Sequence, residues 1–406
     1  MIESYAHGRV NLMGEHTDYN GGWVLPTLIP QKTEVQLRRR NDDLVRVRSD
    51  MAVRSSEAAL GSHLISRTTL PAAPDAGSTF ASLASAASSA ASSSAPSRGT
   101  AIAGPEKFDY EYYLGWESKT GQWPDYVQGA TQFLREKGFK LKGFDLTVLS
   151  NVPVGSGLSS SAALEVALLK ALRQAFGLTF DDIEMAHLGQ KIENEFIGAR
   201  VGILDQMAIG LGRENHALYL DTQLMEYDLI PLPAKAFDLV VINSGVTHNH
   251  ASGDYNQRRA ECEAACKELE IVTLRDLGMS DLAKLDQLDE KLKRRARHVI
   301  TENARVHQAV QAIKAVDFVS LGQLFYQSHE SMRDDYQVSV PQIDLLIELC
   351  RAEATVYGAR LTGGGFGGSI VAITHLHQGR QLAEKIVDRY AQKQSQFKAT
   401  IMTPMA

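Results

Sequence analysis

The chain has little of several features that mark particular protein classes. Three cysteines among 406 residues are too few for a disulfide framework. Cys262 and Cys266 lie one helical turn apart, and we expect them to pack in a core rather than bind a metal. Positive charge is not in excess, because 42 Lys and Arg against 48 Asp and Glu leave a net charge of −6. A nucleic-acid partner would need a basic face, so none is expected.

Long apolar runs are also missing. No segment reaches the roughly 18 apolar residues that a membrane helix needs. The first residues, Met1 to Tyr5, have neither the basic part nor the apolar part of a signal peptide. We therefore expect no membrane partner. The low cysteine content fits the reducing cytoplasm, and we expect a monomer. What the chain does have is 44% hydrophobic residues, enough for a large core and two domains.

Strand-like and helix-like segments occur in clusters, which is typical of an α+β fold. Residues 33–50 alternate apolar and polar positions and predict a β-hairpin. A boundary within 222–236 would separate two domains, 1–228 and 229–406. Residues 78–98 contain nine Ser and seven Ala, which predicts a mobile insertion. Further helices are expected over 123–136, 159–175, 183–197, 254–270 and 281–314, and further strands over 23–25, 107–114, 144–149 and 237–242.

Polar side chains are concentrated between residues 8 and 26. Glu15, His16 and Asp18 lie between Gly14 and Gly21, so the backbone can turn tightly and approach a ligand. Such groups suit a sugar, because each hydroxyl needs a hydrogen-bonding partner. An ordinary polar surface loop is the alternative.

A glycine- and serine-rich turn occupies residues 152–161. A strand is expected before it and a helix after it, which places free backbone N–H groups and the positive end of a helix dipole together. This arrangement binds phosphate without a lysine. The hydroxyls of Ser159, Ser160 and Ser161 can donate to phosphate or ligate Mg²⁺. The alternative is a serine-rich helix cap that binds no ligand.

Two later segments complete the set of candidate motifs. Residues 363–368 formally match a dinucleotide-binding pattern, but the β-branched run that follows them predicts a strand where that motif requires a helix. We therefore reject dinucleotide binding there. Asp205 lies beside Ile203 and Leu204. A carboxylate in such surroundings is either a salt-bridged or capping residue or a functional one.

These segments resemble, in the same order, the motifs of the galactokinases, which are members of the GHMP family of small-molecule kinases. The resemblance spans about residues 7–375, apart from the Ser/Ala-rich insertion. Met13 stands where Ile is more usual, and Ser156 lies in the Gly-rich turn; neither removes a required group. The resemblance implies a two-domain α+β architecture. Its N-terminal domain would be like ribosomal protein S5 and its C-terminal domain ferredoxin-like.

The resemblance also implies an activity, which is transfer of the γ-phosphate of ATP to the C1 hydroxyl of α-D-galactose, with Mg²⁺. By analogy, Asp205 is the catalytic base, and Arg9 beside it keeps it ionised and stabilises the transferring phosphate. Ser161 and Glu193 would hold Mg²⁺. The sugar would contact Glu15, His16, Asp18, Gly202 and Tyr255, and the nucleotide would contact Gly155, Ser156, Gly157, Leu158, Ser159, Ser160, Ser161, Trp123, Gly364 and Gly365.

Two other functions stay open at this point. One is a related sugar kinase that acts on N-acetylgalactosamine or L-arabinose, because the sequence does not show the pocket shape near C2 and C6. The other is a non-enzymatic galactose sensor. Relatives of that kind lose residues of the serine-rich turn, whereas Ser161 and Ala162 are present here, which favours catalysis. Trp123 has an alternative of its own, which is simple core packing.

Overall fold

The computed structural model describes residues 1–49, 108–233, 235–246 and 251–403. Its first part is built on an eight-stranded sheet in the order β2-β7-β3-β6-β4-β5, with β1 paired to β3 and β8 paired to β7. The strands are β1 (Ile2–Asn11), β2 (Trp23–Val24), β3 (Pro26–Arg39), β4 (Leu44–Ser49), β5 (Tyr110–Tyr113), β6 (Phe144–Ser150), β7 (His216–Asp221) and β8 (Glu226–Pro231).

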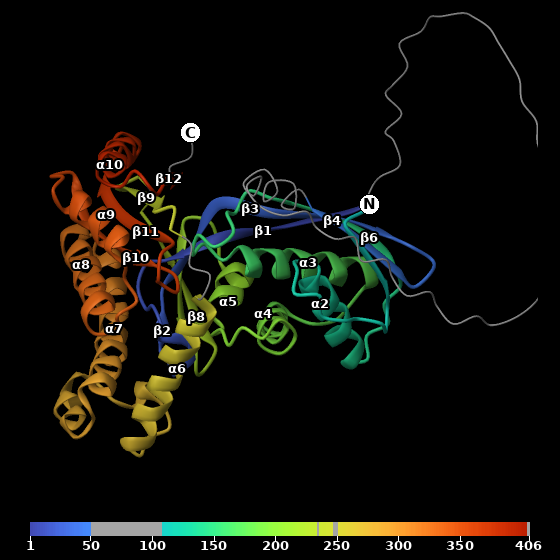
Figure 1. Cartoon of the computed structure of the whole chain (residues 1–406), viewed down its shortest axis with the longest axis horizontal. Coiled ribbons are helices and arrows are strands. Elements are labelled where there is room, and N and C mark those ends of the chain that lie inside the picture. The colour runs from blue at the N-terminus through green and yellow to red at the C-terminus, as the bar shows by residue number, and fades with distance from the viewer. Residues whose placement is uncertain (50–107, 234, 247–250, 404–406) are drawn as a thin grey trace, which may run out of the picture.

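Helices lie along one face of this sheet (Figure 1). The central one, α3, is rich in Ala, Leu and Val, and 11 of its 17 residues are buried, as expected for a helix enclosed between a sheet and other helices. The helical segments are α2 (Asp125–Glu136), α3 (Ser160–Phe176), α4 (Asp182–Lys191), a π-helical segment (Ile192–Ile197) and α5 (Leu204–Leu211).

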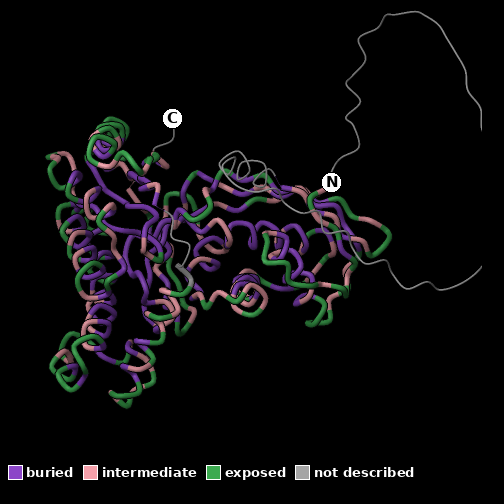
Figure 2. The backbone as a smooth tube through the Cα atoms, in the orientation of Figure 1, coloured by how far each residue is buried: buried purple, intermediate pink, exposed green. Residues whose placement is uncertain are grey.

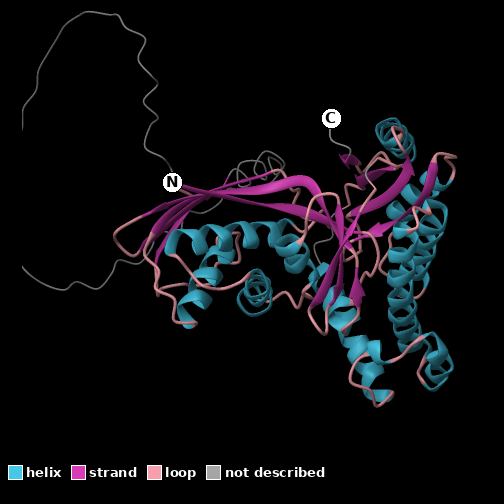
Figure 3. Ribbon diagram, turned by 180° about the vertical axis from the view of Figure 1, so that it is seen from behind, coloured by secondary structure: helices cyan, strands magenta, loops and turns pink. Residues whose placement is uncertain are grey.

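The second part has a four-stranded antiparallel sheet in the order β10-β11-β9-β12. Long helices pack beside it (Figure 3). The strands are β9 (Phe237–Asn243), β10 (Val356–Thr362), β11 (Ser369–His375) and β12 (Thr400–Thr403). The helices are α6 (Ala251–Glu268), α7 (Glu290–Lys314), α8 (Phe318–Asp334), α9 (Pro341–Arg351) and α10 (Gly379–Lys393).

The two parts share a continuous apolar core. One cluster of buried residues joins Val10 and Leu168 of the first part to Val306, Phe325 and Val371 of the second. Buried chain accordingly runs without a break from one sheet to the other (Figure 2). This packing holds the segments that line the site against one another.

The expected hairpin over 33–50 is wrong, although both of its strands exist. β6 lies between β3 and β4, antiparallel to the first and parallel to the second. Asp145 of β6 receives hydrogen bonds from Arg38 of β3 and from Arg46 of β4. Alternation along a sequence identifies a strand, but it does not identify the strand's partner.

Two expected helices are each divided. The helix expected over 183–197 ends as α4 at Lys191 and continues as the π-helical segment. The helix expected over 281–314 is a 3-10 stretch (Met279–Gln287) followed by α7. The side chain of Asp289 caps α7 by accepting from the backbone N–H of Leu292. The Asp289 cap therefore fixes where α7 begins, although the helical sequence pattern continues across this position.

Other expectations can be compared directly with the structure. The two strands around residues 363–368 are β10 and β11, as the rejection of a dinucleotide motif required. Cys262, Cys266 and Cys350 are free thiols buried in the protein. Within the described ranges, no helix combines the length and apolar character needed to cross a membrane. The insertion expected over 78–98 lies outside the described residues.

Candidate active site

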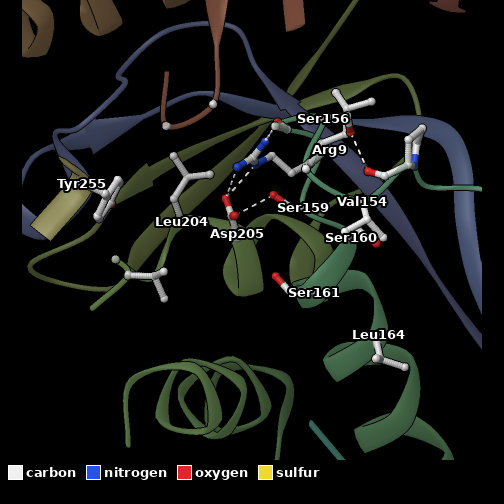
Figure 4. A pocket seen from close by; sticks show the side chains of 18 of the residues that line it. Arg9, Val154, Ser156, Ser159, Ser160, Ser161, Leu164, Leu204, Asp205 and Tyr255 are labelled. Carbon is white, nitrogen blue, oxygen red and sulfur yellow. Dashed lines mark hydrogen bonds and ion pairs between the residues drawn. The ribbon is translucent and has the colours of Figure 1, made fainter. Parts of the chain in front are cut away.

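A cavity of about 420 Å³ brings most of the sequence-predicted residues together. Figure 4 shows it from close by. Its lining includes Arg9, Glu15, His16, Asp18, Trp123, residues 155–161, Gly202, Asp205, Tyr255 and Gly364. Gly365 lines an adjoining hollow of about 230 Å³ instead. Glu193 does not line the cavity, but its carboxyl group hydrogen bonds with Ser161, which does.

The glycine- and serine-rich turn over residues 152–161, called the phosphate loop below, lies between a strand and a helix as expected. β6 ends at Ser150 and α3 begins at Ser160. Gly155 and Gly157 have φ values of 71° and 74°, which only glycine adopts readily. A Cβ on Gly157 would lie 3.1 Å from the carbonyl oxygen of Thr362. The glycine-rich segment 363–368, which follows Thr362, therefore begins close to this turn. Backbone N–H groups and the start of a long helix therefore face the cavity.

Asp205 accepts three hydrogen bonds from side chains that line the cavity. It lies in the first turn of α5, opposite Arg9 of β1. Arg9 donates to Asp205 Oδ1 from Nε at 2.7 Å and from Nη2 at 2.5 Å. Ser159 donates to the other oxygen, Oδ2, at 2.6 Å. Arg9 Nη1 also donates to the carbonyl of Gly157 at 2.6 Å, which joins the pair to the phosphate loop.

The loop between β1 and β2, called the first loop below, places the acidic side chains of Glu15 and Asp18 in different surroundings. Glu15 is buried, and its Oε1 accepts from the backbone N–H of Gly363 at 2.8 Å. Burial raises the pKa of Glu15. Asp18 lies against Gly202, where a Cβ would be 1.7 Å from Asp18 Oδ2. Burial and the nearby charge of Asp205 raise the pKa of Asp18 to about 6. Gly202 is therefore required sterically, because Asp18 fills its side-chain space.

His16 is held by aromatic neighbours. Its Nδ1 lies 2.9 Å from the hydroxyl of Tyr19, which lies 2.7 Å from the hydroxyl of Tyr336. Its ring is 5.3 Å from that of Tyr255, centre to centre. Burial lowers the pKa of His16 to about 3, so the ring is neutral and can both donate and accept a hydrogen bond.

Ser161 and Glu193 form a second polar pair. Ser161 hydrogen bonds with the Glu193 carboxyl and with the hydroxyl of Tyr126. Burial, with the charge of Asp205, raises the pKa of Glu193 to about 7. The π-helical segment carries Glu193, and such segments alter the side-chain phase of a helix, often at functional sites.

Several site residues were missed by the sequence reasoning. Tyr126 lines the cavity beside Trp123; it lies in the same short segment, which could have drawn attention to it. Arg360 is fully buried in β10, and its Nη2 is 3.6 Å from Glu15 Oε1. Neither Arg360 nor Tyr336 has a local signal, because the partners that join them to the first loop and strand, Asn11 and Tyr19, lie more than 300 positions away in the chain.

Family models match three parts of the chain. Residues 125–213 match the GHMP kinases N terminal domain, and residues 309–392 match the GHMP kinases C terminal. Residues 3–39, which hold Arg9 and the first loop, match the galactokinase galactose-binding signature. Together with the two-part α+β fold and the glycine-rich phosphate loop, these matches define a GHMP kinase.

Whole-chain relatives narrow this class. A galactokinase of Pasteurella multocida is 36% identical over 97% of this chain and 90% of its own length. One of Chloroflexus aurantiacus is 37% identical over 95% of this chain and 87% of its own. The structure of Lactococcus lactis galactokinase complexed with galactose matches with a TM-score of 0.81 and 31% identity, covering 98% of this chain and 92% of that one. The chain belongs to the galactokinase family.

A more distant match supports the fold alone. The phosphomevalonate kinase of Streptococcus pneumoniae has a TM-score of 0.61 at 14% identity, and the match covers 97% of each chain. The architecture is thus shared with proteins whose sequences have diverged widely.

Proposed function

We propose that this chain transfers the γ-phosphoryl group of ATP to the C1 hydroxyl of α-D-galactose, giving α-D-galactose 1-phosphate and ADP. One observation carries the proposal. The Arg9–Asp205 pair lies in a single cavity that is also lined by the glycine- and serine-rich turn 155–161 and by residues of the segment that matches a galactose-binding signature. Membership of the galactokinase family supports the same reaction.

Phosphoryl transfer depends mostly on positioning and on neutralising charge. In the proposal, Asp205 accepts or orients the proton of the C1 hydroxyl as phosphorus–oxygen bond formation begins. Arg9 holds the carboxylate through two hydrogen bonds and would stabilise the negative charge of the transferring group. The bond between the γ-phosphorus and the bridging oxygen breaks, and ADP leaves with that oxygen.

The remaining roles follow from position in the cavity. Glu15, His16, Asp18, Gly202 and Tyr255 would surround the sugar, with Asp18 accepting hydrogen bonds from its hydroxyls. For the nucleotide, backbone N–H groups of residues 155–161 would hold the phosphates, Gly364 and Gly365 would cover them, and Trp123 would flank the base. Of the loop side chains, Ser156 already donates to the carbonyl of Pro153 at 2.7 Å, and Leu158 is buried. Both would therefore act through their backbone.

Ser161 and Glu193 suit Mg²⁺ in their donor chemistry. Their hydroxyl and carboxylate oxygens are the hard ligands that this ion prefers, and Mg²⁺ in kinases is usually held by one or two carboxylates together with substrate phosphates. Among the described residues no group of three or more His, Cys, Asp or Glu side chains could hold a metal ion. A site completed by ATP agrees with that finding. When bound, the ion would neutralise phosphate charge.

ADP release in the presence of Mg-ATP tests the proposal. Galactose, N-acetylgalactosamine, L-arabinose, glucose and no sugar should be compared, and we expect turnover with galactose only. Turnover with another sugar of the panel would keep the phosphate chemistry and overturn the sugar assignment. Binding of galactose and ATP without turnover would favour a galactose sensor instead.

The role of Asp205 needs a variant of its own. Asp205→Asn keeps the shape of the side chain and removes its charge, and we expect kcat to fall at least ~100-fold, as for loss of a general base. Activity near that of the unaltered chain would refute the mechanism.

Three further assignments, on oligomeric state, location and domain boundaries, belong to the same proposal. We regard the protein as a monomer of the cytoplasm, and light scattering in solution tests the first point. The division into domains 1–228 and 229–406 is also proposed. The pairing of β8 with β7 continues the first sheet to Pro231, past the proposed boundary at 228, so limited proteolysis should cut close to 232–236.

A further inference from the structure

Ser159 has a backbone conformation that serine rarely adopts. Its φ is 58° and its ψ is 52°, in the left-handed region. Such a conformation is strained outside glycine and persists only where the surroundings impose it. Ser159 is also the residue that precedes α3, where a serine hydroxyl normally accepts from a backbone N–H of the first turn. Here it makes no such cap.

The hydroxyl is directed to Asp205 instead. It donates to Oδ2 at 2.6 Å, whereas both hydrogen bonds from Arg9 go to Oδ1. Figure 4 shows Ser159 pointing toward Asp205, with Ser160 and Ser161 pointing elsewhere. Three consecutive serines therefore face different surroundings, and the first contacts the proposed base.

The backbone around Ser159 is fixed to the same pair. Arg9 donates from Nη1 to the carbonyl of Gly157 and from its backbone N–H to the carbonyl of Leu158, at 2.6 and 3.2 Å. With the Ser159 hydroxyl, residues 157–159 contact the Arg9–Asp205 pair at three successive positions. The phosphate loop and the base are therefore joined as one unit, and that unit holds Ser159 in its left-handed conformation.

We infer that Ser159 is a positioning residue for Asp205 rather than a ligand of the nucleotide phosphates. Arg9 holds one carboxylate oxygen, and Ser159 fixes the rotation of the carboxylate by holding the other. A hydrogen bond to a charged acceptor is directional and stronger than a neutral one. The inference rests on the proposed function, because the base is oriented for attack by a sugar hydroxyl.

Ser159→Gly is the sharpest variant, because glycine removes the hydroxyl and adopts a positive φ without strain. We expect kcat to fall roughly 10- to 100-fold, the loss associated with a hydrogen bond to a charged group. KM for ATP and the dissociation constant of Mg-ADP should change less than about threefold. Ser159→Ala removes the same hydroxyl and retains the Cβ, and it replaces Ser159→Gly if that variant does not fold.

Ser160→Ala provides the contrast, because its hydroxyl lies in the same loop and is assigned to the nucleotide. We expect it to raise KM for ATP more than it lowers kcat. If Ser159→Gly shows that pattern instead, with weaker Mg-ADP binding and unchanged kcat, Ser159 is a phosphate ligand and the inference is wrong.

A double-mutant cycle separates action through Asp205 from a general structural effect. In the Asp205→Asn background, removing the Ser159 hydroxyl should lower kcat by less than about threefold, because residues that act as a unit are not additive. Additive losses would overturn the inference. Absence of turnover by the unaltered chain would overturn the proposed function and this inference with it, whereas normal galactose turnover with additive losses would overturn only this inference.

Discussion

Removal of the buried Arg360 guanidinium should destabilise the protein in a pH-dependent way. Its Nη2 lies 3.6 Å from Glu15 Oε1 and 3.6 Å from Glu302 Oε1, and its Nη1 donates to the carbonyl of Asn11 at 3.1 Å. Arg360→Met retains much of the side-chain volume and leaves both carboxylates without this cation. Removing one partner of a buried ion pair costs about 3–5 kcal/mol, because a buried charge is left uncompensated.

The two carboxylates are not affected equally. Glu302 keeps the ion pair with Arg305 at 2.7 Å and the hydrogen bond from Ser328 at 2.7 Å. Glu15 keeps the hydrogen bond from the backbone N–H of Gly363, one from the Asn11 side chain and the charge of Arg9, but it has no second cation paired to it at the distance of Arg305 from Glu302. Most of the cost therefore falls on Glu15, which can reduce it by taking up a proton.

The sign of the pH dependence follows from the pKa of Glu15. Burial raises this pKa, and the charge of Arg360 opposes the increase, so the pKa rises further in Arg360→Met. A carboxyl group with a raised folded-state pKa releases its proton first in the unfolded chain, near pH 4.5. Native stability then falls as pH increases toward the folded-state pKa. The deficit should be larger at pH 8 than at pH 5.

Urea unfolding followed by intrinsic fluorescence at pH 5 and pH 8 measures this deficit. Lys142→Met is the control, because its ion pair with Asp43 joins side chains that are 55% and 57% exposed and should matter little. A deficit below about 1 kcal/mol at pH 8 would refute the reasoning. A deficit of equal size at both pH values would refute the role of Glu15 protonation.

Three further predictions concern the site. Gly202→Ala should raise KM for galactose at least ~10-fold, because the new methyl group occupies the space of the Asp18 carboxylate; Gly210→Ala, in helix α5 that follows Gly202, meets only ordinary contacts and should leave KM unchanged. KM for galactose should rise as pH falls through about 6, where Asp18 takes up a proton, and a flat profile would contradict this. The Tm of Glu165→Gln minus that of the unaltered chain should be larger at pH 8 than at pH 5. Burial raises the pKa of Glu165 well above its usual range, so as pH rises the unfolded chain loses this proton first and the native state of the unaltered chain is destabilised. Equal differences in Tm at the two pH values would exclude this.

The site was predictable from sequence where its residues are contiguous. The turn over residues 155–161 is one segment with one geometry, so its glycines and the following helix could be recognised from their order. The direction of the Ser159 hydroxyl could not, because it depends on a φ of 58° that the surrounding structure imposes. Arg360 could not be found either, since its partners Asn11 and Glu15 come from the other end of the chain.

Strands were likewise easier to predict than their partners. The alternation over 33–50 identified β3 and β4, but β6 comes about 100 residues later in the chain and separates them. No local sequence pattern distinguishes a strand that pairs with the next strand in the sequence from one that pairs with a strand far along the chain.

That inserted strand also constrains the order of assembly. β4 and β5 are paired to each other, and among the described strands they join the main sheet only through β6. During synthesis, a nascent chain that has not reached Ser150 therefore presents the facing edges of β3 and β4 unpaired, with Arg38 and Arg46 lacking their common carboxylate. Since unpaired strand edges promote association between chains, this interval is the one in which a chaperone would protect the protein most.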